Sequence, residues 1–300
     1  MSAAETAGKP VTFAQRLHVG LLYCLPQHLV SRCLYVITRR RIPGVARIIR
    51  WFVRRYAVDL HEAERADATA YATFNEFFTR ALKSDARTVA DLPLGLVSPV
   101  DGTVSELGRI ASGKLLQAKG IDYELAALLG GVIDPDPFAD GAFATLYLSP
   151  RDYHRVHMPC AGKLLAMSYV PGRLFSVAPH TVATVRRLFT RNERVVCLFE
   201  SALGPVVLVL VGAINVAAIE TVWHGLVTPP HRSRPQHWRY AETPVELAAG
   251  EEMGRFNMGS TVILVAPPTV QWLTHFVHGT AIRLGEALSS AVGSRDRQPD

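Results

Sequence analysis

Three short stretches of the sequence contain residues of the kinds that carry out acid–base and nucleophilic chemistry. Asp101 lies in SPVDGTVSELG, His154 and His157 lie in LYLSPRDYHRVHMPCAGKL, and Ser260 lies in RFNMGSTVILV. A serine hydroxyl is a weak nucleophile until a base accepts its proton, and a histidine works best as that base when an acid fixes its tautomer. The residue types therefore allow an Asp-His-Ser arrangement, whatever their order along the chain.

Each stretch also has an ordinary structural interpretation. Asp-Gly between β-forming runs is a common hairpin turn signal, and Gly-Ser-Thr before an apolar run is a common turn leading into a strand. The two histidines are three residues apart, and structural histidines are frequent in β-rich proteins. No clear third or fourth ligand accompanies them, so we do not expect a metal site.

Ser260 is not placed as in a conventional hydrolase. The G-x-S-x-G nucleophile elbow is missing, because Val262 stands where the second glycine would be. The sequence therefore gives a conventional esterase or protease little support. Two alternatives are kept: a membrane-associated serine hydrolase acting on lipid esters, and a non-catalytic membrane-binding module. Labelling of Ser260 by a fluorophosphonate probe in an intact chain would favour the hydrolase.

The elements that must position these residues are mainly β. Runs of β-forming residues between Gly, Pro and Asp turns predict strands near 95–107, 141–148, 162–169, 194–200, 206–211, 215–223 and 261–265. Helical patterns cover about 11–60 and recur near 71–82, 122–129 and 182–189. We expect an α+β fold in which basic N-terminal amphipathic helices precede a mainly β catalytic core. The predicted division is a membrane-associating region at 1–60 and a catalytic domain at 61–300.

The N-terminal part concentrates the positive charge of the chain, whose net charge is +6. Residues 11–60 hold nine arginines and a single acid, whereas the remainder is slightly acidic. Within 45–56, apolar residues follow helical spacing on one face and arginines fall on the other, a pattern typical of a helix lying in a membrane interface. The apolar set is Val45, Ile48, Ile49, Phe52 and Tyr56, and the basic set is Arg47, Arg50 and Arg54.

The basic N-terminal region has three other possible interpretations. The same helix could instead dock on the core of its own protein. A nucleic acid is not expected, because an apolar face this wide is not needed to grip phosphates. The stretch 19–37 is a poor spanning helix, since Pro26, His28 and Arg32 interrupt it.

The four cysteines have no C-x-x-C spacing, which favours reduced thiols in a cytoplasmic setting.

Six blocks of the sequence, in order, resemble those of bacterial membrane-associated phosphatidylserine decarboxylase proenzymes. They are PVDGTVSELG, YLSPRDYHRVHMPCAG, YVPGRLFSV, RNERVVCLFE, VGAINVAAIETVW and GRFNMGSTVILV. NEFFTRALKSDAR and LQAKGIDYELAALLG are also similar, and the resemblance runs from about residue 73 to 265. Two departures are visible: Met258 stands where the family usually has Leu, and SVAPHTV lacks the usual Asn before its proline region.

The resemblance implies that the serine attacks the chain itself. The Ser260 hydroxyl would add to the carbonyl of Gly259, the peptide bond would become an ester, and β-elimination would cut the chain. The products would be a beta chain of residues 1–259 and an alpha chain of residues 260–300 that begins with a pyruvoyl group. Glycine suits the attacked position because it has no side chain to obstruct its carbonyl.

The family also implies a role for each candidate residue. His157 would accept the serine proton and Asp101 would orient His157. The pyruvoyl cofactor, derived from Ser260, would form a Schiff base with phosphatidylserine and accept electrons as carbon dioxide leaves. His154 would deliver a proton to the carbanion, and Ser176 would meet the lipid phosphate. The product would be phosphatidylethanolamine.

The partners follow from the same resemblance. The two cleaved chains would stay together as a heterodimer, and two such pairs would form a dimer. The enzyme would bind an anionic membrane surface peripherally, at the cytoplasmic face of the cell membrane.

Overall fold

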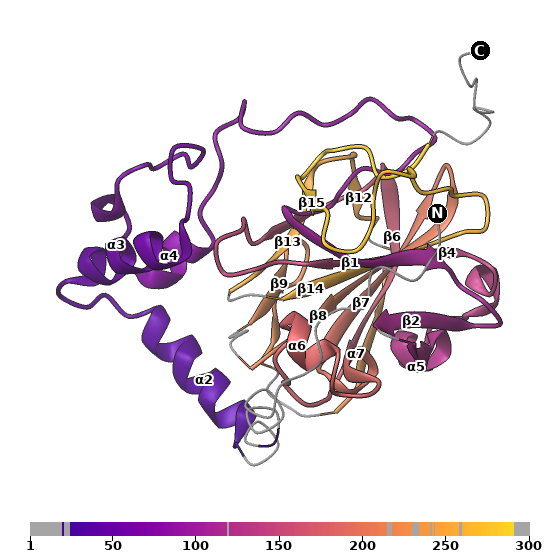
Figure 1. The fold of residues 1–300 in the computed structure, drawn as a ribbon, viewed down its shortest axis with the longest axis horizontal. Coiled ribbons are helices and arrows are strands. Elements are labelled where there is room, and N and C mark those ends of the chain that lie inside the picture. Colours follow the sequence, from indigo (N-terminus) through magenta and orange to yellow (C-terminus); the bar gives the residue numbers. More distant parts are fainter. Residues whose placement is uncertain are drawn as a thin grey trace, which may run out of the picture.

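The structure is a computed structural model that describes residues 20, 25–118, 120–214, 218–229, 234–240, 242, 244–257 and 260–290. It confirms the α+β prediction, with helices gathered in the N-terminal part and a β core after residue 100 (Figure 1). Gly259 of the predicted cleavage site and the ends of the predicted N-terminal and C-terminal segments lie outside the described residues.

The core is built on an antiparallel sheet of nine strands. Its order is β11-β6-β7-β8-β14-β4-β1-β15, and β12 also pairs with β6. The strands are β1 Gly102–Arg109, β4 Ala142–Tyr147, β6 Gly162–Val170, β7 Arg194–Ser201, β8 Gly204–Val211, β11 Gln236–Arg239, β12 Glu246–Leu247, β14 Thr261–Ala266 and β15 Ala281–Ile282. The predicted strands near 141–148, 162–169, 194–200, 206–211 and 261–265 are confirmed within a few residues.

Strand β14 lies inside this sheet, between β8 and β4. Each of its six residues is buried, which explains why the sequence TVILVA is apolar without the alternation of a half-exposed strand. Burial on both faces and hydrogen bonding on both edges hold the segment that follows Ser260 in one position.

Two smaller sheets complete the β structure. The first has the order β10-β9-β13-β5, with β5 at Arg155–His157, β9 at Ile219–Thr221, β10 at Gly225–Thr228 and β13 at Glu252–Phe256. The second pairs β2 Lys114–Ala118 with β3 Ile121–Glu124. The predicted strand near 215–223 corresponds to β9, although 215–217 lie outside the described residues.

The N-terminal helices lie to one side of the β core (Figure 1). They are α2 Gln27–Thr38, α3 Val45–Tyr56, the 3-10 turn η1 Ala68–Ala70 and α4 Phe74–Phe78. Gly44, with a φ of 81°, separates α2 from α3 in the left-handed conformation that glycine adopts without strain. Thr73 caps α4 by accepting a hydrogen bond from the Glu76 N–H at 3.1 Å.

The amphipathic face of α3 packs mainly on the protein itself. Ile49 and Phe52 are buried in a small aromatic cluster with Tyr71, Phe77 and Phe78. This cluster continues past residue 60, where the sequence prediction had placed the boundary of the helical region. The docking alternative therefore describes much of this face, while Ile48 and Trp51 remain exposed.

Helix α2 buries its polar face and exposes its apolar face, the reverse of a helix that docks on a core. Its buried residues are polar, Gln27, Ser31 and Thr38. Its exposed residues include the large apolar side chains Leu29, Val36 and Ile37. The Gln27 Oε1 accepts a hydrogen bond from the Leu174 N–H at 2.8 Å, which attaches the helix to the core through its polar side. Among the described residues, no helix is long and apolar enough to cross a bilayer.

The remaining helices are short. They are α5 Leu125–Leu129, η2 Asp136–Phe138, α6 Pro179–Val182 and α7 Leu188–Arg191. The predicted helix near 122–129 was wrong in its first half, because residues 121–124 pair with β2. The predicted helix near 182–189 was also wrong in its middle, since α6 and α7 are separate short turns. The predicted helix near 71–82 is shortened to α4.

Candidate active site

Ser260 is held at the start of the central strand. Its carbonyl oxygen accepts a hydrogen bond from the Leu148 N–H at 2.9 Å, and the next residue, Thr261, pairs with Tyr147 of β4. The side chain is fully buried, and its Oγ has no hydrogen-bond partner among the described residues. An unpaired buried hydroxyl costs free energy, so its retention in a packed core points to a chemical use.

His157 is the last residue of strand β5, and its hydrogen bonds hold it in one tautomer. Its Nδ1 lies 2.8 Å from the Gly250 carbonyl oxygen, which can only accept, so Nδ1 carries the proton. The Tyr153 hydroxyl then donates to Nε2 over 3.2 Å. Burial lowers the pKa of His157 below its usual range, and this effect outweighs the hydrogen bond to Gly250, which raises it. A neutral imidazole with Nε2 as acceptor is the form that a general base requires.

Asp101 lies immediately before β1, beside His157 but not bonded to it. Its carboxylate accepts two hydrogen bonds from Arg87, at 2.9 and 2.5 Å, and one from the Leu284 N–H at 2.8 Å. The loop that carries Asp101 contacts the histidine through the backbone, because the His157 N–H donates to Pro99 at 2.8 Å. The negative charge of Asp101 is close enough to raise the pKa of His157, against the larger effect of burial.

Gly102, next to Asp101, is required by packing rather than by a hairpin. It begins β1, and a Cβ at this position would collide with the carbonyl oxygen of Tyr147 on β4. The Asp-Gly pair is therefore the entry to a strand whose backbone approaches its neighbour closely. The hairpin turn interpretation of this dipeptide was wrong.

His154 is the most deeply buried titratable group of the site. Its Nδ1 lies 2.7 Å from the Asp152 carbonyl oxygen, and its ring lies 4.1 Å from that of Phe78, centre to centre. Nε2 is buried without a partner, as Ser260 Oγ is. Burial, followed by the charge of Arg80, lowers the pKa of His154 to about 3. At neutral pH this histidine is uncharged, with Nε2 free to accept a proton.

An apolar pocket of about 120 Å³ lies between α3, α4 and the core. Phe78, whose ring contacts that of His154 at a tilt of 45°, and Leu148, whose N–H donates to the Ser260 carbonyl, both line it. Ser176 is in its wall, with Oγ accepting a hydrogen bond from the Ala178 N–H at 3.3 Å. The full lining is Phe52, Tyr56, Phe78, Tyr147, Leu148, Pro150, Ser176, Val177, Ala178, Ala213 and Ile214. Of the predicted site residues, Ser176 lines this pocket; His154 and Ser260 adjoin its lining through Phe78 and Leu148, and Asp101 and His157 do not line it.

Sequence reasoning missed three residues of this site. Tyr153 lies inside the histidine block, so its proximity to His157 could have been anticipated from that stretch alone. Arg87 and Arg80 lie in a segment with no chemical pattern of its own, and only the fold brings them to Asp101 and His154. Within the described residues, no cluster of three or more His, Cys, Asp or Glu side chains could hold a metal ion.

Comparison with known proteins gives consistent matches along the chain. The family model described as phosphatidylserine decarboxylase matches residues 74–290, and a second model, described as PSD, matches residues 17–57. A phosphatidylserine decarboxylase proenzyme of Nitrosococcus oceani is 51% identical over 289 residues, which cover 94% of each chain. One from Bordetella pertussis is 52% identical over 283 residues, covering 92% of this chain and 95% of the relative. One from Chromobacterium violaceum is 51% identical over 281 residues, covering 92% of this chain and all of the relative.

Proposed function

Because this chain belongs to the phosphatidylserine decarboxylase family, we propose that it converts phosphatidylserine to phosphatidylethanolamine with a pyruvoyl group made from its own Ser260. The chain is an enzyme of that family, a carboxy-lyase acting in phospholipid biosynthesis. The observation that carries the pyruvoyl proposal is the fully buried Ser260 hydroxyl, which has no partner and lies at the start of a central strand.

In the proposed self-cleavage, Ser260 Oγ attacks the carbonyl carbon of Gly259 while His157 Nε2 takes the hydroxyl proton. The Tyr153 hydroxyl must leave Nε2 for this step, and the nearby Asp101 carboxylate stabilises the imidazolium that forms. The C–N bond then breaks, which gives an ester and a free amine on residue 260. Loss of the Cα proton and cleavage of the Cβ–O bond leave a carboxylate on Gly259 and a dehydroalanine at residue 260. Water then replaces the amine of the dehydroalanine, which gives the ketone of the pyruvoyl group and releases ammonia.

The position of residue 260 fits this group, because its carbonyl, which the reaction retains, accepts a hydrogen bond from Leu148, a residue of the pocket lining. The pyruvoyl group supplies a ketone that binds the substrate amine and accepts the electron pair released with carbon dioxide. An apolar surrounding favours this loss of charge from a carboxylate. Ser176, in the pocket wall, is the proposed contact of the lipid phosphate.

His154 has a proposed role that its protonation state shapes. Because its Nε2 is unprotonated at neutral pH, it must receive a proton before it can donate one. The carboxylate and phosphate of the bound substrate raise the affinity of Nε2 for a proton above that of the empty site, so we assign to it the proton that the head-group ammonium must lose to react. His154 then returns it to the carbon that has lost carbon dioxide. This order of proton transfers refines the donor role predicted for His154.

The membrane contact is proposed for the outer side of the helices. The exposed apolar side chains of α2 and α3 form what we call the outer apolar face: Leu29, Val36, Ile37, Ile48 and Trp51. Exposed arginines lie among them, at positions 32, 40, 41, 47 and 50. Apolar groups beside arginines suit peripheral binding to an anionic leaflet, which here would be the cytoplasmic face of the cell membrane. Assembly of the cleaved pair into a dimer stays a prediction.

The test compares wild type with Ser260→Ala and with the control Ser290→Ala, which changes another serine of the same C-terminal segment. Intact mass under denaturing conditions should show two chains for wild type and the control, the smaller lighter by one ammonia than a chain beginning with serine. Ser260→Ala should remain one chain and form no phosphatidylethanolamine. Turnover by Ser260→Ala would refute the proposal, and fluorophosphonate labelling of an uncut wild-type chain would favour the lipid hydrolase instead.

A further inference from the structure

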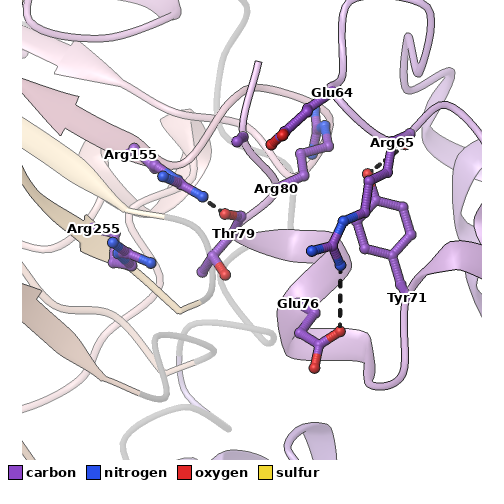
Figure 2. A pocket seen from close by; sticks show the side chains of 9 residues that line it. Glu64, Arg65, Tyr71, Glu76, Thr79, Arg80, Arg155 and Arg255 are labelled. Carbon is purple, nitrogen blue, oxygen red and sulfur yellow. Dashed lines mark hydrogen bonds and ion pairs between the residues drawn. The ribbon is translucent and has the colours of Figure 1, made fainter. Parts of the chain in front are cut away.

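A second pocket, of about 170 Å³, lies next to the α4 turn and is polar where the first is apolar. Phe78 lines the apolar pocket, whereas the next two residues, Thr79 and Arg80, line the polar one. Figure 2 shows Arg155 and Arg255 on the side of the β core, Arg65, Tyr71 and Glu76 on the side of the helices, and Thr79 and Arg80 between them. The full lining is Glu64, Arg65, Tyr71, Glu76, Thr79, Arg80, Ala81, Arg155 and Arg255.

Arg80 is the buried cation of this pocket, with 4% of its surface exposed. One of its nitrogens, Nη2, donates to the Arg151 carbonyl at 3.1 Å and more distantly to the Asp152 carbonyl at 3.5 Å. Nε is buried without a partner, and Nη1 makes no hydrogen bond among the described residues. No carboxylate of the described residues lies within ion-pair distance of this guanidinium. An unpaired buried charge is strongly destabilising, so Arg80 is incomplete as it stands.

Arg194 shows how the same protein satisfies a buried arginine that has only a structural role. Its Nε donates to Leu128, its Nη1 to Thr190 and Asn192, and its Nη2 to Ala127, all through backbone carbonyls at 2.5 to 3.0 Å. Every nitrogen of that guanidinium therefore has an acceptor. Arg80 has acceptors for one nitrogen only, and it lines a pocket, which distinguishes it from a structural arginine.

The other charges around the pocket do not compensate Arg80. Arg155 and Arg255 both pair with Glu252, at 2.8 Å each, and so share one carboxylate. Arg65 lies 3.9 Å from Glu76, and Glu64 is the other carboxylate in the lining. Four guanidinium groups thus line the pocket, against the two lining carboxylates and the Glu252 carboxylate that Arg155 and Arg255 share.

We propose that this pocket binds a phosphate-class anion between Arg80 and the arginines of β5 and β13. The planar guanidinium fork suits the oxygens of a phosphate, and a tetrahedral group can reach arginines on more than one wall. The volume admits a phosphate or a head-group phosphodiester but not a nucleotide. The anion is either free inorganic phosphate or the head group of an anionic phospholipid. This inference goes beyond the proposed decarboxylation and does not depend on it.

Titration calorimetry on the full-length protein tests the site, with inorganic phosphate in one arm and dihexanoyl phosphatidylglycerol below its micellar concentration in the other. Sodium chloride at matched ionic strength is the blank. Arg80→Gln and Arg255→Gln should each weaken binding of the preferred anion at least roughly tenfold. The matched control Arg186→Gln changes an exposed arginine outside the pocket and should leave binding unchanged.

The two arms distinguish the source. Saturable binding of inorganic phosphate that both variants weaken identifies a free-anion site, and binding of the lipid alone identifies a head-group site. Arg255→Gln keeps the proposal testable if Arg80→Gln fails to fold, because Arg255 is only partly buried at the other wall. Absence of binding in both arms, or binding that Arg255→Gln leaves unchanged, would overturn the proposal.

Discussion

His154 and His157 are three residues apart in the chain, and both are neutral, yet their surroundings differ. His157 Nε2 accepts from Tyr153, near the Asp101 charge, whereas His154 Nε2 has no partner and the His154 ring contacts that of Phe78. Removal of His154 should therefore leave self-cleavage intact. We predict that His154→Ala still yields two chains by mass, while decarboxylation falls by roughly 10² or more, the usual size of a lost general acid.

His157→Ala serves as the matched variant, because it removes the other imidazole, at the opposite end of the short strand β5. It should block cleavage and so remain a single chain. If His154→Ala also remained uncut, the two histidines would share one role, and the proposed division between cleavage and proton return would be wrong.

The low pKa of His154 makes a prediction about stability. The unfolded chain takes up a proton near the ordinary value of 6.5, but the folded site resists protonation down to about 3. Stability from this residue is therefore complete above 6.5 and is lost as the pH falls below it, by up to about 1.4 kcal/mol per pH unit. Urea unfolding of Ser260→Ala and of Ser260→Ala/His154→Gln should show the steeper decline in the first between about pH 6.5 and about pH 4.5. Equal slopes would show that His154 is not buried neutral.

At the scale of elements, α2 and α3 make a contrast that sequence periodicity alone did not resolve. Helix α3 buries Ile49 and Phe52 in the aromatic cluster, while α2 places Leu29, Val36 and Ile37 outside. Replacing those three α2 side chains with Gln should weaken binding to anionic vesicles at least roughly tenfold. The thermal unfolding midpoint should hardly change, since no packed group is lost.

Vesicle flotation and scanning calorimetry on the uncut Ser260→Ala chain measure the two effects. Ile49→Gln is the contrasting variant, because it should lower the midpoint by creating an unsatisfied buried group. Charge reversal at Arg47, Arg50 and Arg54 should also weaken binding, by roughly 1 kcal/mol or more per residue. Vesicle binding that survives the triple Gln substitution would remove α2 from the membrane contact.

The elements that could be predicted from sequence are those with a long, uniform pattern. After Thr261, the run VILVA is apolar throughout because β14 is buried on both faces, and the strand could therefore be predicted from the sequence. Strand β5, only Arg155–His157, is too short to give a period, although it carries His157. The contact of Asp101 with Arg87 could not be foreseen either, because it depends on a connecting segment without regular structure. Chemical residue types were readable, whereas their partners depended on the tertiary fold.

At the scale of the whole molecule, the proposed cut lies directly before β14, an interior strand whose six residues are all buried. Residues 261–265 pair with β8 and residues 261–266 with β4, and Leu284 bonds to Asp101 on the other side of the cut. These backbone hydrogen bonds should therefore keep the C-terminal segment bound to the rest of the folded protein after cleavage. We predict that both wild-type chains elute together in native size-exclusion chromatography and separate only in denaturant. Release of the smaller chain in native buffer would contradict this placement of β14.

The position of β14 also means that the proposed cleavage would change how the central sheet can form. A continuous chain assembles the sheet in a first-order reaction, because both neighbours of the strand belong to the same molecule as the strand itself. Once the chain is divided, regaining that sheet from the unfolded state becomes a second-order encounter between a long fragment and a short one, and its rate depends on dilution. The cleaved protein of the proposal would then keep a fold that it could not readily rebuild, and its lifetime would be set by how slowly it unfolds.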